Sequence, residues 1–441
     1  MLFVLFVANI GMDFEAAVQY LLSLGHETLA IKLGLRNTEL LLKALDNPER
    51  AFQSVQIAGT NGKGSTAVML DSICRAAGVK TGLYTSPHLV SMTERIKLSG
   101  AEITGEEFAA CATIVRDVSE QLLRDKQTDA LPTFFEQVTT IALIAFRNAG
   151  IELAILETGL GGRLDSTTAA NALIVAITPI AMDHEEYLGP TLESIAGEKA
   201  AIIRPGVSAV LATQPPEAFE VLLQRCEKTG VVPIFEDSAH LIEDTTSDGR
   251  FCVTFESARH RYEKVWLGLR GEHQIDNAAV AIRLAELLQI PSCAIVAGVS
   301  DATHPGRLEL IAHRPAFLID GAHNPAGAES LRTYLDEFAS RPLTLVFGAM
   351  RDKQLEQMGA ILFPIADLLV LTKVQNPRSA TAEMVEPIAL RFARGEVFRS
   401  DTSEEALQIA LANTSREGMI CIAGSLYLAG EMRPQILELG K

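Results

Sequence analysis

The sequence predicts an α/β protein in which a larger and a smaller domain each contain a mostly parallel sheet. Short apolar runs alternate with helical segments along nearly the whole chain, which is the pattern of a sheet covered by helices on both faces. The chain has 441 residues, more than one ordinary hydrophobic core holds. Its hydrophobic content of 48% and charged content of 21% are typical of a globular protein. We therefore predict a first domain over residues 1–300 and a second over residues 301–441.

The predicted elements of the first domain follow the chain in order. Apolar residues recur at helical spacing in two N-terminal segments, Asp13–Leu24 and Thr38–Leu45. An apolar run that ends at Ala58 predicts a buried strand, and the residues from Thr66 to Ala77 predict the helix after it. The remaining predicted elements are a strand at Lys80–Tyr84, helices at Gly105–Leu123 and from Pro132 to Ala149, strands at Leu153–Leu156 and Leu173–Thr178, a hairpin within residues 249–267, and a helix at Asp276–Leu288.

Proline and glycine mark the junction with the second domain. Pro291 and the stretch Ser300–Gly306 predict an interdomain joint. Beyond the joint, apolar strands separated by helical segments predict a smaller, Rossmann-like α/β domain. The strands are expected at Ala316–Asp320, Leu343–Gly348, Leu368–Thr372 and Met419–Ala423.

A glycine-rich turn, Gly59-Thr60-Asn61-Gly62-Lys63-Gly64-Ser65, joins the first predicted strand to its helix. Glycines let backbone N–H groups close on an anion, and the helix N-terminus adds roughly half a positive charge there. Lys63 supplies a mobile full charge, and the hydroxyl of Ser65 or Thr66 can reach a phosphate or its metal. The sequence therefore predicts a phosphate-binding site at Asn61, Gly62, Lys63, Gly64 and Ser65.

The turn departs from the usual P-loop spacing in two places. Ile57 stands where that pattern has its first glycine, and Gly64 stands where it has a serine or threonine after the lysine. The alternative interpretation is a strand-to-helix turn that binds no ligand. The strand and the helix on either side favour the phosphate site.

Polar residues follow four of the predicted strands. Lys63 and Ser65 follow the first strand, Ser86 the second, Glu157 ends the third, and the pair Asp183-His184 follows the fourth. Ligands of parallel sheets bind just beyond the carboxyl ends of the strands. A carboxylate at the tip of a buried strand also suits Mg²⁺, which prefers oxygen ligands. The alternatives are a helix cap for Glu157, a turn serine for Ser86 and a structural role for His184.

Four more charged or polar residues are candidate site residues, but their spacing in the sequence alone does not distinguish a functional from a structural role. Lys199, taken by itself, is an ordinary helix-surface lysine. Arg307 follows the predicted joint, and Asp320 and His323 close a strand of the second domain. These last three could close over a nucleotide bound by the first domain, or they could form an interdomain polar contact.

Composition excludes several classes of protein. The net charge of −17 argues against general affinity for nucleic acid or anionic membranes. The six cysteines are scattered without a CxxC pair, as in a reduced, cytoplasmic protein. The apolar segment Met1–Ala8 is too short to span a bilayer. Because Met12 precedes a clean amphipathic helix, we expect residues 1–11 to be a dispensable extension.

Several motifs occur in one order along the chain. They are Gly59–Ser65, Thr85–Leu89, Glu157–Asp165, Glu198–Ala200, His273–Ala279, Pro305–Arg307 and Asp320–Pro325. Their residues and order resemble those of the folylpolyglutamate synthase/dihydrofolate synthase family, which belongs to the Mur ligase superfamily of ATP-dependent amide-bond-forming enzymes. The resemblance extends from Met12 to about Tyr427.

The resemblance implies a nucleotide and two metal ions. The residues implied to hold ATP are Asn61, Gly62, Lys63, Gly64, Ser65, Asn277, Arg307, Asp320 and His323. Ser86 with Glu157 would hold one Mg²⁺, and His184 with Glu157 would hold a second. Lys199 matches a lysine that family members carry as a carbamate, which would make it a metal ligand. The residues implied to be catalytic are Lys63, Glu157, His184 and Lys199.

The resemblance also implies a pterin site. The implied residues are Thr133, Phe134, Phe135, Glu136, Leu164, Asp165 and Ser166. The chain departs from the family at Thr168, where asparagine is usual, and this departure questions only a local turn.

The implied activity is ATP-dependent ligation of L-glutamate to folates, and to 7,8-dihydropteroate, through an acyl phosphate. The first domain would bind ATP and folate, and the second would be of the glutamate-ligase type. We expect a cytoplasmic monomer that acts on small molecules and binds neither nucleic acid nor membrane. Two alternatives stay open: another Mur-type amino-acid ligase, which would need a nucleotide-sugar-binding domain before the loop, and a nucleotide-dependent switch ATPase. The folate form and the number of glutamates added are also open.

Overall fold

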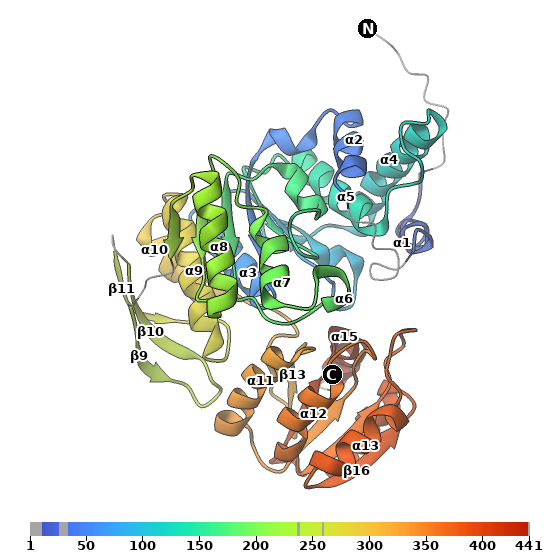
Figure 1. The fold of residues 1–441 in the computed structure, drawn as a ribbon. Helices are drawn as coiled ribbons and strands as arrows, with labels where there is room; N and C mark the ends of the chain where they lie inside the picture. Colours follow the sequence, from blue (N-terminus) through green and yellow to red (C-terminus); the bar gives the residue numbers. More distant parts are fainter. Residues whose placement is uncertain (1–10, 26–33, 236–238, 258–259, 440–441) are drawn as a thin grey trace.

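The computed structural model describes residues 11–25, 34–235, 239–257 and 260–439. They form two α/β units that lie one above the other in Figure 1, and a small antiparallel sheet lies beside the upper unit. The larger unit contains an eight-stranded sheet and the smaller unit a six-stranded sheet, so the predicted fold class is confirmed. The predicted apolar segment Met1–Ala8 lies outside the described residues.

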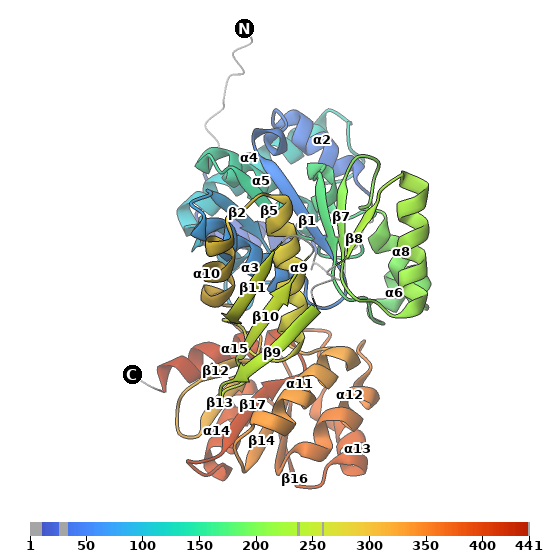
Figure 2. The same ribbon diagram turned by 90° about the vertical axis from the view of Figure 1, so that its left-hand side faces the viewer.

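The sheet of the larger unit has β1 (Gln53–Ala58) at its centre, parallel to β5 (Leu153–Glu157) and β6 (Ile174–Ile177). The strand order is β4-β3-β2-β5-β1-β6-β7-β8, and β2, β5, β1, β7 and β8 can be followed across the sheet in Figure 2. The other strands are β2 (Thr81–Tyr84), β7 (Ser208–Leu211) and β8 (Pro233–Phe235), which continue the parallel arrangement, and β3 (Ile96–Leu98) and β4 (Ala101–Glu102), which form an antiparallel edge. The loops after β1, β2, β5 and β6 therefore meet at one edge of the sheet.

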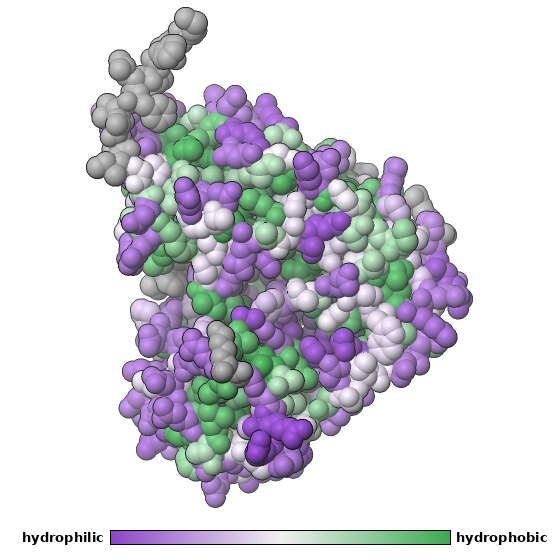
Figure 3. All heavy atoms as spheres, turned by 180° about the vertical axis from the view of Figure 1, so that it is seen from behind, coloured by the Kyte–Doolittle hydropathy of each residue, from purple (hydrophilic) through white to green (hydrophobic). Residues whose placement is uncertain are grey.

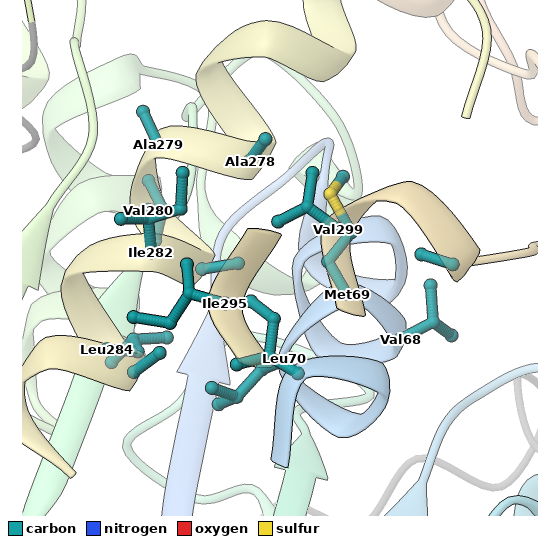
Figure 4. Packing of buried hydrophobic residues seen from close by; sticks show 14 of the residues in the cluster. Val68, Met69, Leu70, Ala278, Ala279, Val280, Ile282, Leu284, Ile295 and Val299 are labelled. Carbon is teal, nitrogen blue, oxygen red and sulfur yellow. The ribbon is translucent and has the colours of Figure 1, made fainter. Parts of the chain in front are cut away.

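One face of this sheet is covered by α3 (Lys63–Ala76), α9 (His273–Leu287) and α10 (Ser292–Asp301). Figure 4 shows buried apolar side chains of these three helices gathered between them; they include Leu70, Ile282, Leu284, Ile295 and Val299. The small antiparallel sheet packs against the same core; its strands are β9 (Ala239–Thr245), β10 (Phe251–Glu256) and β11 (Arg261–Trp266). Removing this apolar surface from water fixes α3, and with it the loop that precedes it.

The opposite face is covered by the remaining helices of the larger unit. Ile155 belongs to the α3 side and its neighbour Leu156 to the other side, because successive strand residues point to opposite faces. The covering helices are α1 (Phe14–Ser23), α2 (Arg36–Ala44), α4 (Gly105–Arg124), α5 (Phe134–Ala149), α7 (Leu192–Ala200) and α8 (Pro216–Thr229). Short turns of helix lie at η1 (Pro48–Ala51), η2 (Met92–Arg95), η3 (Ser166–Ala170) and α6 (Glu185–Leu188).

Three local predictions differ from the structure. The helix after β1 begins at Lys63 and not at Thr66, because Gly62 adopts a φ of 85° and ends the loop directly before the lysine. The predicted hairpin is part of a three-stranded sheet, since β9 pairs with β10. The predicted joint is shorter, since Ser292–Asp301 is a helix that packs on α3.

The smaller unit has the strand order β12-β13-β17-β14-β15-β16. Four strands match the predicted ones: β13 (Ala316–Ile319), β14 (Leu343–Phe347), β15 (Leu368–Thr372) and β17 (Met419–Ala423). The sequence did not predict the two edge strands β12 (Glu309–Ile311) and β16 (Glu396–Ser400), which lack a fully apolar run. The helices are α11 (Pro325–Phe338), α12 (Leu355–Leu362), α13 (Ala382–Phe392), α14 (Ser403–Asn413) and α15 (Leu426–Glu438), with a short turn at η4 (Phe363–Ile365).

In the described part of the chain, no helix is both long and apolar enough to cross a bilayer. Figure 3, which views the side opposite to Figure 1, shows hydrophilic side chains spread over both units with hydrophobic ones among them. All six cysteines are free; five are buried and Cys293 is exposed.

Candidate active site

The loop between β1 and α3 brings its backbone close to two other elements. Gly59 and Gly62 have φ angles of 153° and 85°, which side-chain-bearing residues rarely adopt. A Cβ atom at Gly62 would collide with the Asn277 amide, so glycine is needed for this close approach. Lys63 Nζ donates to the carbonyl oxygens of Gly59 at 3.2 Å and Thr60 at 3.1 Å. The ammonium group is thus held over the loop.

Residues from four strand ends and from the smaller unit line one cavity of about 170 Å³. The residues predicted to bind ATP or metal are all among its lining residues: Asn61, Gly62, Lys63, Gly64, Ser65, Ser86, Glu157, His184, Lys199, Asn277, Arg307, Asp320 and His323. Asp183 and Asn324 also line it, together with His273 and Gln274. Both units therefore contribute to the cavity.

Glu157 lies at the tip of β5 and is 5% exposed. Its Oε2 accepts a hydrogen bond from the backbone N–H of Ser86 at 3.1 Å. Burial raises the pKa of the Glu157 carboxyl, although the nearby Lys63 ammonium opposes the rise. A buried carboxylate with spare oxygen lone pairs is a site where a divalent cation would relieve the cost of the charge.

Lys199 lies on α7 and is 4% exposed, so the interpretation as a surface lysine is wrong. Its Nζ donates to the carbonyl oxygen of Gly59 at 2.7 Å, beneath the phosphate loop. Burial, and secondly the Lys63 ammonium, lower the pKa of Lys199 to about 7. Near neutral pH a large fraction of this amine is therefore unprotonated.

Asp183 follows β6 and accepts hydrogen bonds from the smaller unit. Lys353 Nζ lies 2.6 Å from Asp183 Oδ1, and the Asn324 amide nitrogen lies 3.2 Å from Oδ2. His323 Nε2 lies 3.4 Å from the same Oδ2. Although burial alone would raise it, the pKa of Asp183 lies well below its usual range, because His323, His184 and Lys353 surround the carboxylate.

His184 is next to Asp183 and adopts a φ of 52° at the start of α6. Its pKa is lowered to about 4 by burial, although the Asp183 carboxylate opposes this. The imidazole is therefore neutral at physiological pH and keeps a lone pair for a metal. Sequence reasoning placed His184 correctly but missed Lys353, which lies in a polar loop after β14 with no motif to mark it.

Asp320 and His323 bring the smaller unit to the cavity. Asp320 Oδ2 accepts from the backbone N–H of Leu308 at 2.9 Å, and its Oδ1 accepts from that of Ala322 at 2.9 Å. Burial raises the pKa of Asp320, although the Arg307 guanidinium opposes the rise. These contacts fix the loop after β13 so that His323 faces Asp183.

The residues predicted to hold a pterin lie behind one wall of the cavity. Thr133 and Glu136 form a capping box at the start of α5, and Phe134 is buried in the core against Arg95. A Cβ at Gly159 would lie 2.5 Å from the ring of Phe135, and Gly159 itself lines the cavity. None of the seven predicted pterin residues lines that cavity.

Asp165 is used within the loop that forms this wall. Its Oδ2 accepts from the backbone N–H groups of Gly159 at 2.8 Å and Leu160 at 2.9 Å. Its Oδ1 accepts from the Thr167 hydroxyl at 2.5 Å. Ser166 Oγ accepts from the Thr38 hydroxyl at 3.2 Å, and Leu164 is half-buried in the same loop. Asp165 and Ser166 therefore shape the wall, and the role of the segment in binding a pterin stays a prediction.

The turn with the departing residue Thr168 is formed regularly. Thr168 Oγ1 donates to the carbonyl oxygen of Gly162 at 2.7 Å and accepts from the Gln56 amide at 2.8 Å. The buried pair Gln56–Thr168 ties the turn to the central strand.

The donor set fits a nucleotide phosphate chain with divalent cations. Glycine positions that accept no Cβ, the Lys63 ammonium and the N-terminus of α3 suit phosphate. Within the described ranges, no group of three or more His, Cys, Asp and Glu side chains is placed to hold a metal.

A phosphate loop at the end of a central parallel strand, facing a second α/β unit across a shared cavity, defines an ATP-dependent ligase of the Mur type. Residues 57–285 match the Mur ligase middle domain, and residues 306–426 match the glutamate ligase domain of Mur ligases. The chain is 33% identical to the dihydrofolate synthase/folylpolyglutamate synthase of Bacillus subtilis, over 93% of this chain and 97% of that protein. The chain belongs to the folylpolyglutamate synthase/dihydrofolate synthase family.

Solved structures agree with this assignment. Mycobacterium tuberculosis folylpolyglutamate synthase complexed with ADP has a TM-score of 0.89 and 33% identity, and the match covers 96% of this chain and 99% of that one. Escherichia coli FolC in complex with DHPP and ADP has a TM-score of 0.86 and 29% identity, over 98% of this chain and 99% of that one.

Proposed function

We propose that this protein joins L-glutamate to a folate carboxylate and converts ATP to ADP and phosphate. As a member of its family it is an ADP-forming acid–amino-acid ligase. The shared cavity is the observation that supports assigning this reaction to particular residues. There Lys63, Glu157 and Lys199 of the larger unit line the same space as Arg307 of the interdomain connection and Asp320 of the smaller unit.

The reaction proceeds in two steps. A carboxylate oxygen of the folate attacks the γ-phosphorus of ATP, the bond to the β–γ bridging oxygen breaks, and an acyl phosphate and ADP form. The amine of glutamate then attacks the acyl carbon, loses a proton, and phosphate leaves. Phosphoryl transfer depends mainly on positioning and charge neutralisation. Lys63 and Arg307, two of the basic residues that line the cavity, would supply them.

We assign two Mg²⁺ sites to the residues around Glu157. One would use Ser86 and Glu157, and the second Glu157 and His184, which is supported by their place around one cavity and by the neutral imidazole of His184. Bound there, Mg²⁺ would neutralise phosphate charge and align the reacting oxygens. The chain holds these ligands ready through the Ser86 N–H bond to Glu157.

Lys199 would complete this ligand set as a carbamate. The neutral amine attacks CO₂, an N–C bond forms, and a proton leaves, so that a cation site becomes an anion with two oxygens. Its burial and its pKa of about 7 supply the required neutral amine. Carbamylation also removes the repulsion between the Lys199 and Lys63 ammonium groups.

Contact between the units would protect the acyl phosphate from water. Lys353 and Asp183 form an ion pair in which both side chains are at most 10% exposed, and Gln354 donates to Glu185 at 2.6 Å. These contacts hold the two units together beside the cavity. Exclusion of water there would favour attack by the amine over hydrolysis.

The wall formed by residues 159–166 would face the pterin, with Thr133–Glu136 and Leu164–Ser166 supporting it. The complex of E. coli FolC with DHPP supports a second activity on 7,8-dihydropteroate, which we also propose for this chain. We further propose that it acts as a monomer in the cytoplasm, and its free cysteines support a reducing compartment.

The test is ligation and phosphate release by the purified chain, with dihydropteroate and tetrahydrofolate offered separately. Glutamate-dependent ADP formation with a glutamylated product supports the proposal, and the preferred acceptor identifies the folate form. ATP hydrolysis that ignores both the acceptor and glutamate would instead indicate a switch ATPase. A different required amino acid would indicate another Mur-type ligase.

A further inference from the structure

His304 lies in the connection between the two units, after α10 and before β12. It does not line the cavity, yet its ring reaches the phosphate loop from behind. Its Nδ1 lies 3.4 Å from the hydroxyl oxygen of Ser65. Arg307, three residues further along the same connection, does line the cavity. The connection therefore contacts the loop through His304 and lines the cavity through Arg307.

The ring of His304 explains why the residue after Lys63 is glycine. A Cβ at Gly64 would lie 2.8 Å from His304 Cε1, closer than real Cβ contacts, and only 3.4 Å from the Glu157 oxygens. The space that a serine or threonine occupies in the usual P-loop is taken here by a side chain of the interdomain connection. The hydroxyl function is displaced to Ser65, which His304 contacts.

The Ser65 hydroxyl has two hydrogen-bonding neighbours. The Gln274 amide donates to its oxygen at 3.3 Å, and the imidazole of His304 can donate to the same oxygen when its proton is on Nδ1. The imidazole is neutral because burial, and secondly the Arg307 guanidinium, lower the pKa of His304 to about 3. With both lone pairs of its oxygen used in this way, Ser65 keeps its own O–H proton to donate to a phosphate oxygen.

The same connection is fixed to both units. On the larger unit, α10 packs so closely on α3 that a Cβ at Gly298 would collide with the backbone of Ile73. On the smaller unit, the Gly306 carbonyl accepts from the Gly321 N–H at 2.8 Å, and its own N–H donates to Glu309 at 2.9 Å. Residues 304–306 are thus bonded to the smaller unit, and His304 links them to the start of α3.

We propose that His304 is a positioning residue that orients Ser65 and covers Gly64, and so couples the placement of the smaller unit to the affinity of the loop for the ATP phosphates. It acts through Ser65 and touches no substrate. This inference rests on the proposed use of the loop Gly59–Ser65 for ATP, so its test includes a variant of Lys63.

The first experiment measures ADP binding by calorimetry, and KM for ATP and kcat, with the full chain. His304→Ala should raise the dissociation constant of ADP and KM for ATP about fivefold, the value of one hydrogen bond, with kcat changed less than about twofold. His304→Asn can place an amide N–H where Nδ1 lies and should restore the affinity to within about twofold. The matched control is His313→Ala, whose imidazole packs on Phe317 within the smaller unit and away from the phosphate loop.

The second experiment uses the steric contact and does not depend on the hydrogen bond. Gly64→Ala should weaken ADP binding about tenfold while His304 is present, because the new methyl group has to displace its ring. In the His304→Ala background the same change should cost less than about twofold. Melting temperatures of the unliganded variants show that each is folded.

The outcomes separate this inference from the proposed function. Unchanged ADP affinity in His304→Ala, equal losses in His304→Ala and His304→Asn, or additive effects of the changes at residues 64 and 304 overturn the inference. If Lys63→Ala also binds ADP as tightly as the unaltered chain, the loop is not the phosphate site and the proposed function fails as well.

Discussion

Replacing Lys199 by methionine should stabilise the protein, and the gain should depend on pH. The side chain is 4% exposed and its pKa is about 7, whereas a lysine in an unfolded chain titrates near 10.4. Between these two values the unfolded state binds more protons, so the stability of the unaltered chain rises with pH from about 7 to 10. Below pH 7 both states are protonated and the full cost of the buried ammonium remains. The pKa difference corresponds to about 5 kcal/mol.

Lys199→Met should therefore raise the free energy of unfolding by up to about 5 kcal/mol at pH 6, and by much less near pH 10. The measurement is urea unfolding at pH 6, 8 and 9.5 in buffer free of CO₂ and divalent cations. Lys228→Met, at an exposed position of α8, is the control and should change stability equally little at each pH. A gain for Lys199→Met that does not vary with pH would refute the assignment of the buried ammonium.

The same variant should be inactive as a ligase if Lys199 acts as a carbamate. At pH 7 about half of an amine with a pKa of 7 is neutral, against about one part in 3000 for an ordinary lysine, so carbamate forms far more readily here. Activity of the unaltered chain should rise with added CO₂, and Lys199→Ala should be partly rescued by short carboxylates. Full activity of Lys199→Ala without CO₂ or carboxylate would exclude the carbamate.

Three further predictions test the cavity and the contact between units. Glu157→Gln should retain the fold, as circular dichroism checks, but lose ligation at ordinary Mg²⁺; near-normal product formation would remove the metal assignment. Lys63→Ala should lower kcat by about a hundredfold or more, the loss typical of one preorganised donor, and an unchanged kcat at saturating ATP would contradict this. Lys353→Met leaves Asp183 without its buried cation and should lower the free energy of unfolding, measured with urea, by about 3 kcal/mol. Adding Asp183→Asn to this variant should reduce the loss, because the unpaired charge is then gone. If the losses of the two single variants simply add, the pair is not coupled.

Features that follow from local chemistry were predictable from the sequence. The residues after β1, β2, β5 and β6 meet because parallel strands end at one edge of a sheet, and this rule placed Ser86, Glu157 and His184 correctly. Glycine at position 62 likewise indicated a close approach, which proved to be that of Asn277. The four apolar strands of the smaller unit followed from their composition, since they are buried on both faces.

Features that depend on distant partners were not predictable in the same way. Lys199 has the local pattern of an exposed helix residue, and only the folded chain places it under the phosphate loop. The ion pair between Asp183 and Lys353 joins residues 170 positions apart, and neither has a neighbour in the sequence that marks it. The edge strand β16 escaped prediction because its exposed residues carry no apolar signal.

The departure of the loop from the usual P-loop pattern is visible in the local sequence, but its cause lies in a distant residue. Taken locally, Gly64 weakens the prediction of a phosphate site, because a hydroxyl is missing where the pattern has one. In the folded chain the missing side chain and the ring of His304 occupy the same space, and Ser65 carries the hydroxyl instead. The side chain allowed at position 64 is therefore limited by His304, a residue of the interdomain connection 240 positions away in the sequence. A substitution there has to be judged together with position 304, because each of the two residues determines what the other can be.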